Sequence, residues 1–332
     1  MSSTTWWNYT SIIIPIYNAG DRLIECLNSL IYQTLSDIEI ICVLDAPTDN
    51  SVEIVKRFAE QDERIKFIIN ETNLHIAESR NQGLEIAKGE YIGFSDHDDT
   101  RSLDMYEMLY ARVKSIDADI VFSSSYVNNN AKVESVKYNN PSKKSILRSI
   151  ILPIDNKLNE NRLSKSVWAS IYKKSFIESN SLKFKDRRIY YEEDTLFNLK
   201  AFLSTNKISY VDKEFYVWNK SIDSESNKPD VNVAIKQINF LNEMFQYLCE
   251  KDELDNYKNE ILILISEWIS SRNNFPFYNK LSPTQKYSLL TILRKIHFPF
   301  YGKSNDLKFF GRRRIKLSVF IVLLYLDFRR FH

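Results

Sequence analysis

The chain of 332 residues has only 6 glycines and 3 cysteines, and both shortages exclude classes of protein. So few glycines exclude a collagen-like or linker-rich chain. The cysteines, Cys26, Cys42 and Cys249, show no paired spacing, which argues against a disulfide framework, a zinc site and an oxidising compartment. Cys42 lies in an apolar run, as a buried thiol does.

Long apolar runs are also missing. Residues 1–10 lack the basic stretch followed by an apolar stretch that marks a secretory signal, so we expect none. The longest apolar stretch, residues 317–326, is shorter than the about 20 residues that a membrane-spanning helix needs. With 44% hydrophobic and 27% charged residues, the sequence predicts a folded body with one large and one smaller domain.

Charge is unevenly distributed, although the net charge is only +2. Residues 301–332 carry eight basic and two acidic residues, so this segment has a charge of +6 and the rest of the chain −4. The basic residues flank the apolar run 317–326, an arrangement typical of an interfacial helix on an anionic membrane surface. A hydrophobic helix packed on the protein body is the alternative. Nucleic acid is not expected as a partner, because the basic residues do not interleave with aromatic ones.

Short apolar runs alternate with amphipathic segments over the first 125 residues. The apolar runs predict buried strands: Ser11–Pro15, Ile38–Leu44, Ile65–Ile69, Tyr91–Phe94 and Ala118–Ser123. Helical spacing predicts the segments between them: Asp21–Gln33, Ser51–Gln61 with Asp49 or Asn50 as N-cap, Ile76–Lys88 ended by Gly89, and Leu103–Ser115. This alternation predicts an α/β fold with a mostly parallel, doubly wound sheet, whose ligands bind at the carboxyl ends of the strands.

The pattern becomes less regular after residue 125. Asn128–Ser145 is rich in Asn, Lys and Ser and predicts a loop, and Trp168–Tyr216 is an ordered mixture. Helical spacing then returns over Ile235–Glu250, Tyr257–Ser271 and Pro283–Ile296. We therefore expect a ligand-binding α/β domain over residues 1–225, a helical region over 226–300 and a basic, membrane-associating tail over 301–332.

The strongest candidate for chemistry is the acidic cluster Asp96-His97-Asp98-Asp99, directly after the predicted strand Tyr91–Phe94. Its three carboxylates repel one another unless a cation lies between them. Oxygen ligands at this density suit Mg²⁺ or Mn²⁺ bound together with substrate phosphates. A solvated loop that caps the next helix is the alternative, and the position after a buried strand favours the metal site. His97 is either a further ligand or a bystander.

Two other strand ends offer candidate ligand contacts. Tyr17, in the segment Pro15–Asn18 after the first strand, either stacks on a nucleobase or is a half-buried turn residue. Asp45, after the second strand, can accept a hydrogen bond from a base or a ribose hydroxyl. The neighbouring Asp49–Ser51 are assigned to helix capping.

Two helical segments add charged candidates. Arg80 either contacts a diphosphate or the metal loop, or pairs with Glu78 or Glu85 on an exposed helix face. Glu192-Glu193-Asp194 precedes an apolar helical pattern, where a carboxylate is stabilised by the helix dipole and can act as a general base. Simple charge at a helix start is the alternative.

Together and in this order, these segments resemble the family-2 inverting glycosyltransferases with the GT-A fold. The resemblance covers about Ser11 to Ile222 and rests on SIIIPIYN, the Asp45–Ser51 stretch, AESRNQG, FSDHDD and YEEDTLF. It implies metal-dependent transfer of a hexose or N-acetylhexosamine from a UDP-sugar to a hydroxyl of a saccharide or lipid-linked saccharide. The pathway it implies is synthesis of a bacterial surface polysaccharide (capsule, O-antigen or lipooligosaccharide) at the cytoplasmic face of the cell membrane.

The same resemblance implies a role for each motif residue. Asp96 and Asp98 resemble the DxD pair that binds Mn²⁺ or Mg²⁺, with Asp98 the direct ligand. Asp194 resembles the base that deprotonates the acceptor hydroxyl, with Glu193 and Trp168 on the acceptor side. The donor contacts are then Pro15, Tyr17, Asn18, Asp45, Arg80, Asp96 and Lys220. A single base opposite the leaving group gives direct displacement and inversion.

The sequence departs from the family at three positions. His75 stands where the family usually carries Gly, and Pro47 where small polar residues are usual. Asn219 stands where many relatives place an Arg, for which Lys220 is a less rigid substitute.

Three other functions remain as alternatives. A sugar nucleotidyltransferase should have a Gly-rich phosphate loop, and only Gly20 follows the first strand. An oxidoreductase should have GxGxxG after a strand, which the sequence lacks. A non-catalytic, membrane-peripheral protein of the same fold is disfavoured by the intact Asp96, Asp98 and Asp194.

Overall fold

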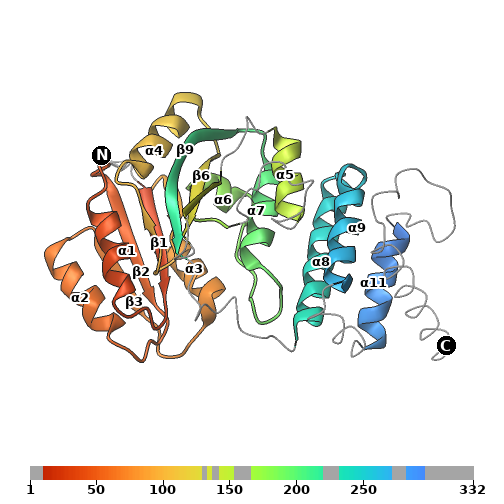
Figure 1. Cartoon of the computed structure of the whole chain (residues 1–332), viewed down its shortest axis with the longest axis horizontal. Coiled ribbons are helices and arrows are strands. Elements are labelled where there is room, and N and C mark those ends of the chain that lie inside the picture. The colour runs from red at the N-terminus through yellow and green to blue at the C-terminus, as the bar shows by residue number, and fades with distance from the viewer. Residues whose placement is uncertain are drawn as a thin grey trace, which may run out of the picture.

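The computed structural model describes residues 10–128, 133–136, 142–152, 166–219, 232–270 and 282–295. The expected tail 301–332 and Lys220 lie outside these residues. The described part is an α/β body followed by helices (Figure 1). Among the described residues, no helix combines the length and the hydropathy that crossing a membrane requires.

A single sheet of nine described strands forms the centre of the body. The order is β3-β2-β1-β4-β8-β6-β9-β5, with β7 paired to β6. The strands β3, β2, β1 and β4 run parallel, whereas β8 is antiparallel to both β4 and β6. Their bounds are β1 Thr10–Ile16, β2 Ile38–Leu44, β3 Ile65–Ile69, β4 Tyr91–Phe94, β5 Thr100–Arg101, β6 Ile120–Asn128, β7 Val133–Val136, β8 Ser170–Lys173 and β9 Ile208–Asn219.

Helices cover both faces of this sheet. Helices α1, α2 and α4 pack on one face and α3 and α5 to α7 on the other, while α8, α9 and α11 form a further layer against α5 and α7 (Figure 1). Their bounds are α1 Arg22–Ile31, α2 Ser51–Gln61, α3 His75–Ile86, α4 Met105–Ile116, α5 Lys143–Ile151, α6 Lys174–Ser179, α7 Glu193–Ser204, α8 Val233–Glu250, α9 Leu254–Ser270 and α11 Pro283–Lys295.

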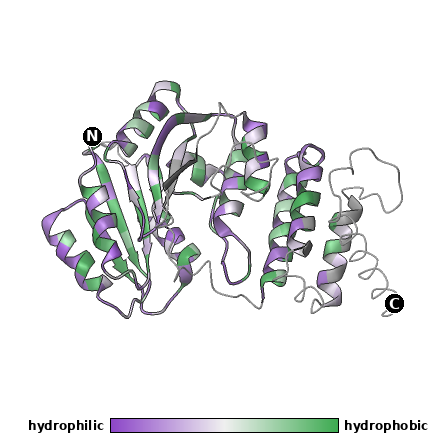
Figure 2. Ribbon diagram, in the orientation of Figure 1, coloured by the Kyte–Doolittle hydropathy of each residue, from purple (hydrophilic) through white to green (hydrophobic). Residues whose placement is uncertain are grey.

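The apolar strands form because both of their faces are buried. Along β1, Ile13 packs in the hydrophobic cluster of the α3 side, whereas Ile12 and Ile14 pack in the cluster of the α1 side. Alternate side chains of a strand point to opposite faces, so a strand covered by helices on both sides must be apolar throughout. Figure 2 shows these strands as hydrophobic along their length and the outer helices as amphipathic.

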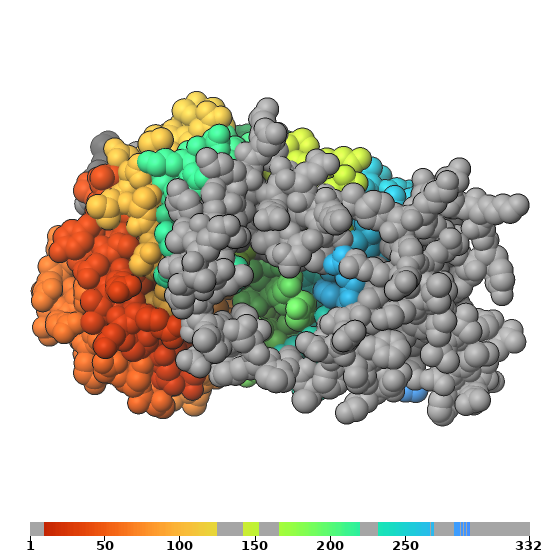
Figure 3. All heavy atoms as spheres, in the orientation of Figure 1, coloured from red at the N-terminus to blue at the C-terminus, as the bar shows by residue number. Residues whose placement is uncertain are grey.

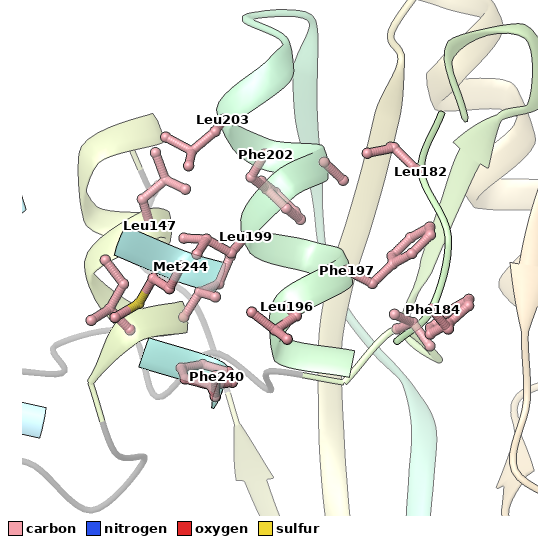
Figure 4. Close-up of a cluster of buried hydrophobic side chains, with 14 of the residues drawn as sticks. Leu147, Leu182, Phe184, Leu196, Phe197, Leu199, Phe202, Leu203, Phe240 and Met244 are labelled. Atoms are coloured by element: carbon pink, nitrogen blue, oxygen red, sulfur yellow. The ribbon is translucent and has the colours of Figure 1, made fainter. Parts of the chain in front are cut away.

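Helix α7 links the sheet to the helical region. Phe197 stacks on Phe184 with ring centroids 4.3 Å apart, on the side of the sheet. Leu196, Leu199 and Leu203 point toward α5 and α8, where Figure 4 shows them beside Leu147 and Met244. On the face seen in Figure 3, the surface between the N-terminal half and the C-terminal helices is set back, and green residues are visible there. One continuous cluster therefore joins the sheet, α7 and the C-terminal helices.

Several details differ from the sequence predictions. The prediction of a loop over 128–145 is wrong in part, because this segment contains β7 and the start of α5. Strand β7 forms despite its polar sequence because it pairs with β6. Helix α3 ends at Ile86 rather than at Gly89, whose N–H instead donates to Ser11 Oγ at 2.8 Å. Beyond β4 the sheet is mixed, because β8 is antiparallel to β4 and β6 and β5 is antiparallel to β9, whereas β6 and β9 are parallel.

Candidate active site

The carboxyl ends of three adjacent parallel strands meet at one edge of the sheet, where the sequence predicted the ligand crevice. Strand β1 lies between β2 and β4, with Ile16 opposite Leu44 and Ile13 opposite Phe94. Asp45 and Asp96 therefore emerge on either side of Tyr17, at the point where the strand order reverses. Ligands of open α/β sheets bind at such a reversal.

Arg80 is the central residue of this crevice. Its side chain is 1% exposed and lies over the Phe184 ring at 5.2 Å. The guanidinium Nη2 donates to Asp96 at 2.9 Å. The other terminal nitrogen, Nη1, donates to Glu193 at 3.3 Å and also to Asp194. The alternative of an exposed arginine paired with Glu78 or Glu85 is wrong, because α3 turns this side chain into the core.

The three carboxylates around Arg80 come from two distant parts of the chain. Asp96 follows β4, whereas Glu193 and Asp194 begin α7. Glu193 is 5% exposed and also lies 4.0 Å from Arg187. A single buried guanidinium therefore joins the expected metal motif to the expected base, a link that neither motif shows alone.

The environment of Asp194 alters its proton affinity. The pKa of Asp194 is raised to about 7 as the net result of opposing effects: burial raises it most, Arg80 and Arg187 lower it, and the neighbouring Glu193 and Asp96 raise it. A carboxylate whose pKa lies near neutrality is suited to accept a proton in a reaction at that pH. The side chain stays 17% exposed, so its oxygens are accessible from the crevice.

The three aspartates of the acidic cluster do not converge on one point. Each of them has a different cation or hydrogen-bond donor as its partner. Asp96 pairs with Arg80, and Asp98 lies 3.6 Å from Arg22. Asp99 is 1% exposed and accepts from the Tyr216 hydroxyl at 2.9 Å and the Asn219 N–H at 2.8 Å. Asp99 points into the protein, so only Asp96 and Asp98 are exposed, and a metal ion beside them stays a prediction.

Asp98 and Asp96 retain the chemistry of cation ligands. Their side chains are 24% and 29% exposed, and carboxylate oxygens suit Mg²⁺ and Mn²⁺. Within the described ranges, no three His, Cys, Asp or Glu side chains converge as a preformed metal cage. The donor set fits a cation held by one or two carboxylates, with diphosphate and water oxygens completing its shell.

The predicted nucleoside side of the crevice is open at Tyr17. This side chain is 42% exposed, as a residue that stacks on a base must be. Asn18 Oδ1 accepts from the Thr48 N–H at 2.8 Å, which ties the β1 end to the β2 end. The Pro15 carbonyl oxygen lies 3.2 Å from His97 Nδ1, so the described contact of His97 is to backbone.

Asp45 is held by the segment before α3. It is 3% exposed and accepts from Asn70 Nδ2 at 3.0 Å and from the backbone N–H groups of Leu74 and His75, each at 2.8 Å. These bonds set the end of β2 against the start of α3. A direct contact to a nucleoside stays a prediction for this residue.

Trp168 is buried where the sequence suggested an acceptor-lining residue. It is 3% exposed and stacks on Tyr216 with ring centroids 4.1 Å apart. This packing leaves little of the indole for a sugar. A direct acceptor contact remains a prediction, and the observed contact is with the residue that bonds Asp99.

The predicted capping residues of α2 bond the start of the helix and also connect two loops. Asp49 Oδ1 accepts from the N–H of Ser51, the first residue of α2, at 3.1 Å. Asn50 occupies the N-cap position without a side-chain hydrogen bond to the helix. Asp49 Oδ2 accepts from the Gly20 N–H at 2.8 Å, and Ser51 Oγ accepts from the Ala19 N–H at 3.1 Å. These side chains fix the turn after β1 to the start of α2.

Unusual backbone conformations gather at this crevice. Of the seven non-glycine residues with positive φ in the described part of the chain, four end a strand or precede a helix here: Asn18, Ala46, His75 and Glu192. The φ of +70° at His75 explains why glycine is usual at this position in the family. Strained residues persist where the surrounding contacts hold them, often at functional sites.

Sequence reasoning missed the residues that support the acidic cluster. Arg22, Arg101 and Tyr216 had no motif to mark them, because they lie on separate elements that only the fold brings together. Asn219 was noted only as a departure, yet its N–H bonds Asp99 and its side chain donates to the Asp98 carbonyl oxygen at 3.1 Å.

Comparison with known proteins agrees with this geometry. Residues 11–182 match the family described as glycosyl transferase family 2. The chain belongs to this family. The resemblance seen in the sequence is thereby confirmed.

Two bacterial proteins illustrate the family relationship. The uncharacterized glycosyltransferase EpsJ of Bacillus subtilis is 33% identical over 219 residues, which cover 66% of this chain and 63% of EpsJ. The cholesterol galactosyltransferase of Borreliella burgdorferi is 27% identical over an alignment that covers 97% of this chain and 95% of that protein. The chain thus spans less than two thirds of EpsJ but nearly all of the second relative.

Solved structures confirm the fold. TarS of S. aureus (residues 1–349, in complex with UDP-GlcNAc) superposes with a TM-score of 0.71 at 20% identity. The match covers 97% of this chain and 92% of that one. The mixed α/β body and its C-terminal helices therefore share the GT-A architecture.

Proposed function

We propose that this protein is an inverting, metal-dependent glycosyltransferase. It transfers a hexose or N-acetylhexosamine from a UDP-sugar to a hydroxyl of a saccharide or lipid-linked saccharide, in synthesis of a bacterial surface polysaccharide. The observation that carries the proposal is the joint contact of Arg80 with Asp96 and Asp194. UDP is proposed as the nucleotide because it is the commonest in this family, and TarS was solved with UDP-GlcNAc.

The two carboxylates have different roles in this reaction. Asp194 accepts the proton of the acceptor hydroxyl, while that oxygen forms a bond to the anomeric carbon and the bond to the UDP oxygen breaks on the opposite side. One displacement of this kind inverts the anomeric centre. When Asp194 becomes neutral, Arg80 keeps Asp96 and Glu193 as partners, so no buried cation is left unpaired.

The leaving group requires positive charge at the other end of the crevice. Mn²⁺ or Mg²⁺, held by Asp98 with Asp96 beside it, would neutralise the charge that grows on the diphosphate. Arg22 lies at the same place, with its guanidinium 3.6 Å from Asp98 and 48% exposed. Tyr17, Asn18 and Asp45 would bind the nucleoside, and Lys220 is proposed from the sequence alone.

A donor screen tests the proposal. The full chain is incubated with Mn²⁺ and a panel of UDP-, GDP- and dTDP-sugars, and released nucleotide is measured. We expect release from a UDP-sugar that stops on chelation and in Asp98→Ala, but not in Asp255→Ala, whose side chain is 92% exposed. A saccharide panel with cholesterol added then identifies the acceptor, because the relative from B. burgdorferi is a cholesterol galactosyltransferase. Release from no sugar with any acceptor, and no metal-dependent UDP binding, would favour a non-catalytic protein.

We propose that the protein acts at the inner face of the cell membrane, to which the basic tail 301–332 would bind. Its support is the sequence pattern of basic residues around residues 317–326. The full chain should sediment with vesicles containing anionic lipid and less with neutral vesicles. Replacing Arg312, Arg313 and Arg314 with Glu should abolish the difference, and an unchanged difference would mean that these arginines do not carry the binding. No preference of the parent protein for anionic vesicles would favour a tail that packs on the body.

A further inference from the structure

Asp99 belongs to the acidic cluster but faces away from the crevice. Both of its carboxylate oxygens are used inside the protein: Oδ2 by the Tyr216 hydroxyl and Oδ1 by the Asn219 N–H. Tyr216 and Asn219 both lie on β9, which is not a neighbour of β4 in the sheet. The end of β9 therefore holds the acidic loop from the side opposite to its exposed carboxylates.

The Tyr216 hydroxyl makes two bonds to this loop. It donates to Asp99 at 2.9 Å and accepts from the Asp96 N–H at 3.1 Å. One oxygen thus fixes the first and the last residue of the loop. Asp96 is one of the two anchored residues and Asp98 lies between them. The side chains of Asp96 and Asp98 can therefore face the crevice.

The Tyr216 ring is itself held on two sides. Trp168 stacks on it at 4.1 Å with an interplanar angle of 14°. The Arg101 guanidinium lies 5.4 Å from the ring centroid, a distance at which a cation is attracted to an aromatic face. Tyr216 is 0% exposed, so its position is determined by packing rather than by solvent.

Arg101 completes the support of the loop. It is 4% exposed and donates to the Asp99 carbonyl oxygen at 3.0 Å and to Ser95 Oγ at 2.7 Å. The short strand β5 holds it against β9, with Arg101 opposite Tyr216. No described carboxylate pairs with this guanidinium within ion-pair distance, so its support of the loop comes from these two hydrogen bonds, to Asp99 and Ser95.

We propose that Tyr216 is a positioning residue that, with Asn219, holds the Asp96–Asp99 loop in the conformation that binds the metal–diphosphate group. This inference rests on the proposed function of that loop. Residues that orient metal ligands through hydrogen bonds typically change metal affinity or activity about 10- to 100-fold when they are removed. The stack on Trp168 makes the tyrosine rigid, so the loop need not be ordered by the ligand.

The test compares Tyr216→Phe with Tyr210→Phe. The first keeps the stacked ring and removes only the hydroxyl that bonds Asp99 and Asp96. The second removes a hydroxyl of the same strand that bonds Ser124 and Asp212. Binding of UDP to the full chain is measured calorimetrically with Mn²⁺ and with chelator, and Mn²⁺ binding in the presence of UDP is followed by electron paramagnetic resonance.

We expect Tyr216→Phe to weaken UDP binding in Mn²⁺ about 10- to 100-fold, with its binding in chelator unchanged. Tyr210→Phe should match the parent protein in both conditions. Asn219→Ala removes the side-chain bond to the Asp98 carbonyl oxygen and keeps the N–H that bonds Asp99. This variant should weaken Mn²⁺-dependent binding to a smaller extent and serves if Tyr216→Phe does not fold.

Three results would overturn the inference in distinguishable ways. If the parent protein binds UDP with Mn²⁺ and folded Tyr216→Phe binds equally well, Tyr216 does not position the loop, and the proposed function stands. If the parent protein shows no Mn²⁺-dependent binding of UDP, the proposed function and the inference both fail. Equal losses in Tyr216→Phe with and without Mn²⁺ would show a general structural role instead.

Discussion

The guanidinium of Arg80 and the carboxylate of Asp194 form an ion pair at the inner end of the crevice. Arg80 is on α3 and Asp194 is in the first turn of α7, 114 residues further along the chain. The pair is nearly enclosed, since the arginine side chain is 1% exposed. It fixes the start of α7 relative to the strand ends that are proposed to bind the donor.

Replacing Arg80 with Lys should reduce activity more than stability. The ammonium keeps the charge but lacks the planar fork that reaches Asp96 and Asp194 together. We expect nucleotide release to fall at least about ten-fold, with a decrease of a few degrees in melting temperature. Arg64→Lys is the control, because Arg64 also bonds a carboxylate, that of Asp62, outside the crevice. Equal activity losses in both variants would contradict a special role for Arg80.

Activity should rise with pH through about 7. The pKa of Asp194 is raised to about 7, so the base is protonated and inactive below this pH and ionised above it. A profile of kcat/KM against pH should show an acid limb there, followed by a plateau. Asp194→Asn should lose the reaction at every pH while still binding UDP. An acid limb near pH 4 instead would mean that burial does not control this carboxyl.

Asp98 and Asp99 should have different roles, the first in activity and the second in stability. Asp98→Asn should abolish metal-dependent nucleotide release with little change in stability, because its described partner is the half-exposed Arg22. Asp99→Ala should lower the free energy of unfolding by about 1–3 kcal/mol for each buried donor left without an acceptor. Denaturant unfolding and nucleotide release, measured on both variants, separate the two roles. A stable Asp99→Ala protein would contradict the buried contacts to Tyr216 and Asn219.

Replacing His75 with Gly should stabilise the protein. A left-handed conformation is unfavourable by about 1–2 kcal/mol for a residue with a side chain, and the added freedom of glycine in the unfolded chain offsets about 0.4–1 kcal/mol of that gain. The free energy of unfolding should therefore rise by about 0.5–1 kcal/mol. His75→Ala keeps the strained φ and should show no gain. A Gly variant no more stable than the Ala variant would contradict strain at this φ, and a loss of stability in both variants would mean that the imidazole itself contributes a contact.

The sequence by itself determined the α/β alternation and the place of the crevice. The apolar runs gave β2, β3 and β4 at their observed bounds, because a strand buried on both faces has little choice but to be apolar. Asp45 and Asp96 were found for the same reason, since residues directly after such strands reach one edge of the sheet. The family motifs added the identity of the chemistry.

Only the tertiary structure decided how the charged residues are paired. From the sequence alone, Arg80 could lie in the crevice or on an exposed helix face. Asp99 was counted among the three carboxylates of the acidic cluster, of which only Asp96 and Asp98 were named as metal ligands. The placements of Arg80 and Asp99 depend on contacts between elements more than 100 residues apart, Arg80 with Asp194 and Asp99 with Tyr216. Local pattern specifies which face of an element is buried, but it does not specify which distant side chain will meet a buried charge there, and that pairing sets the pKa of the proposed base and the geometry of the acidic loop.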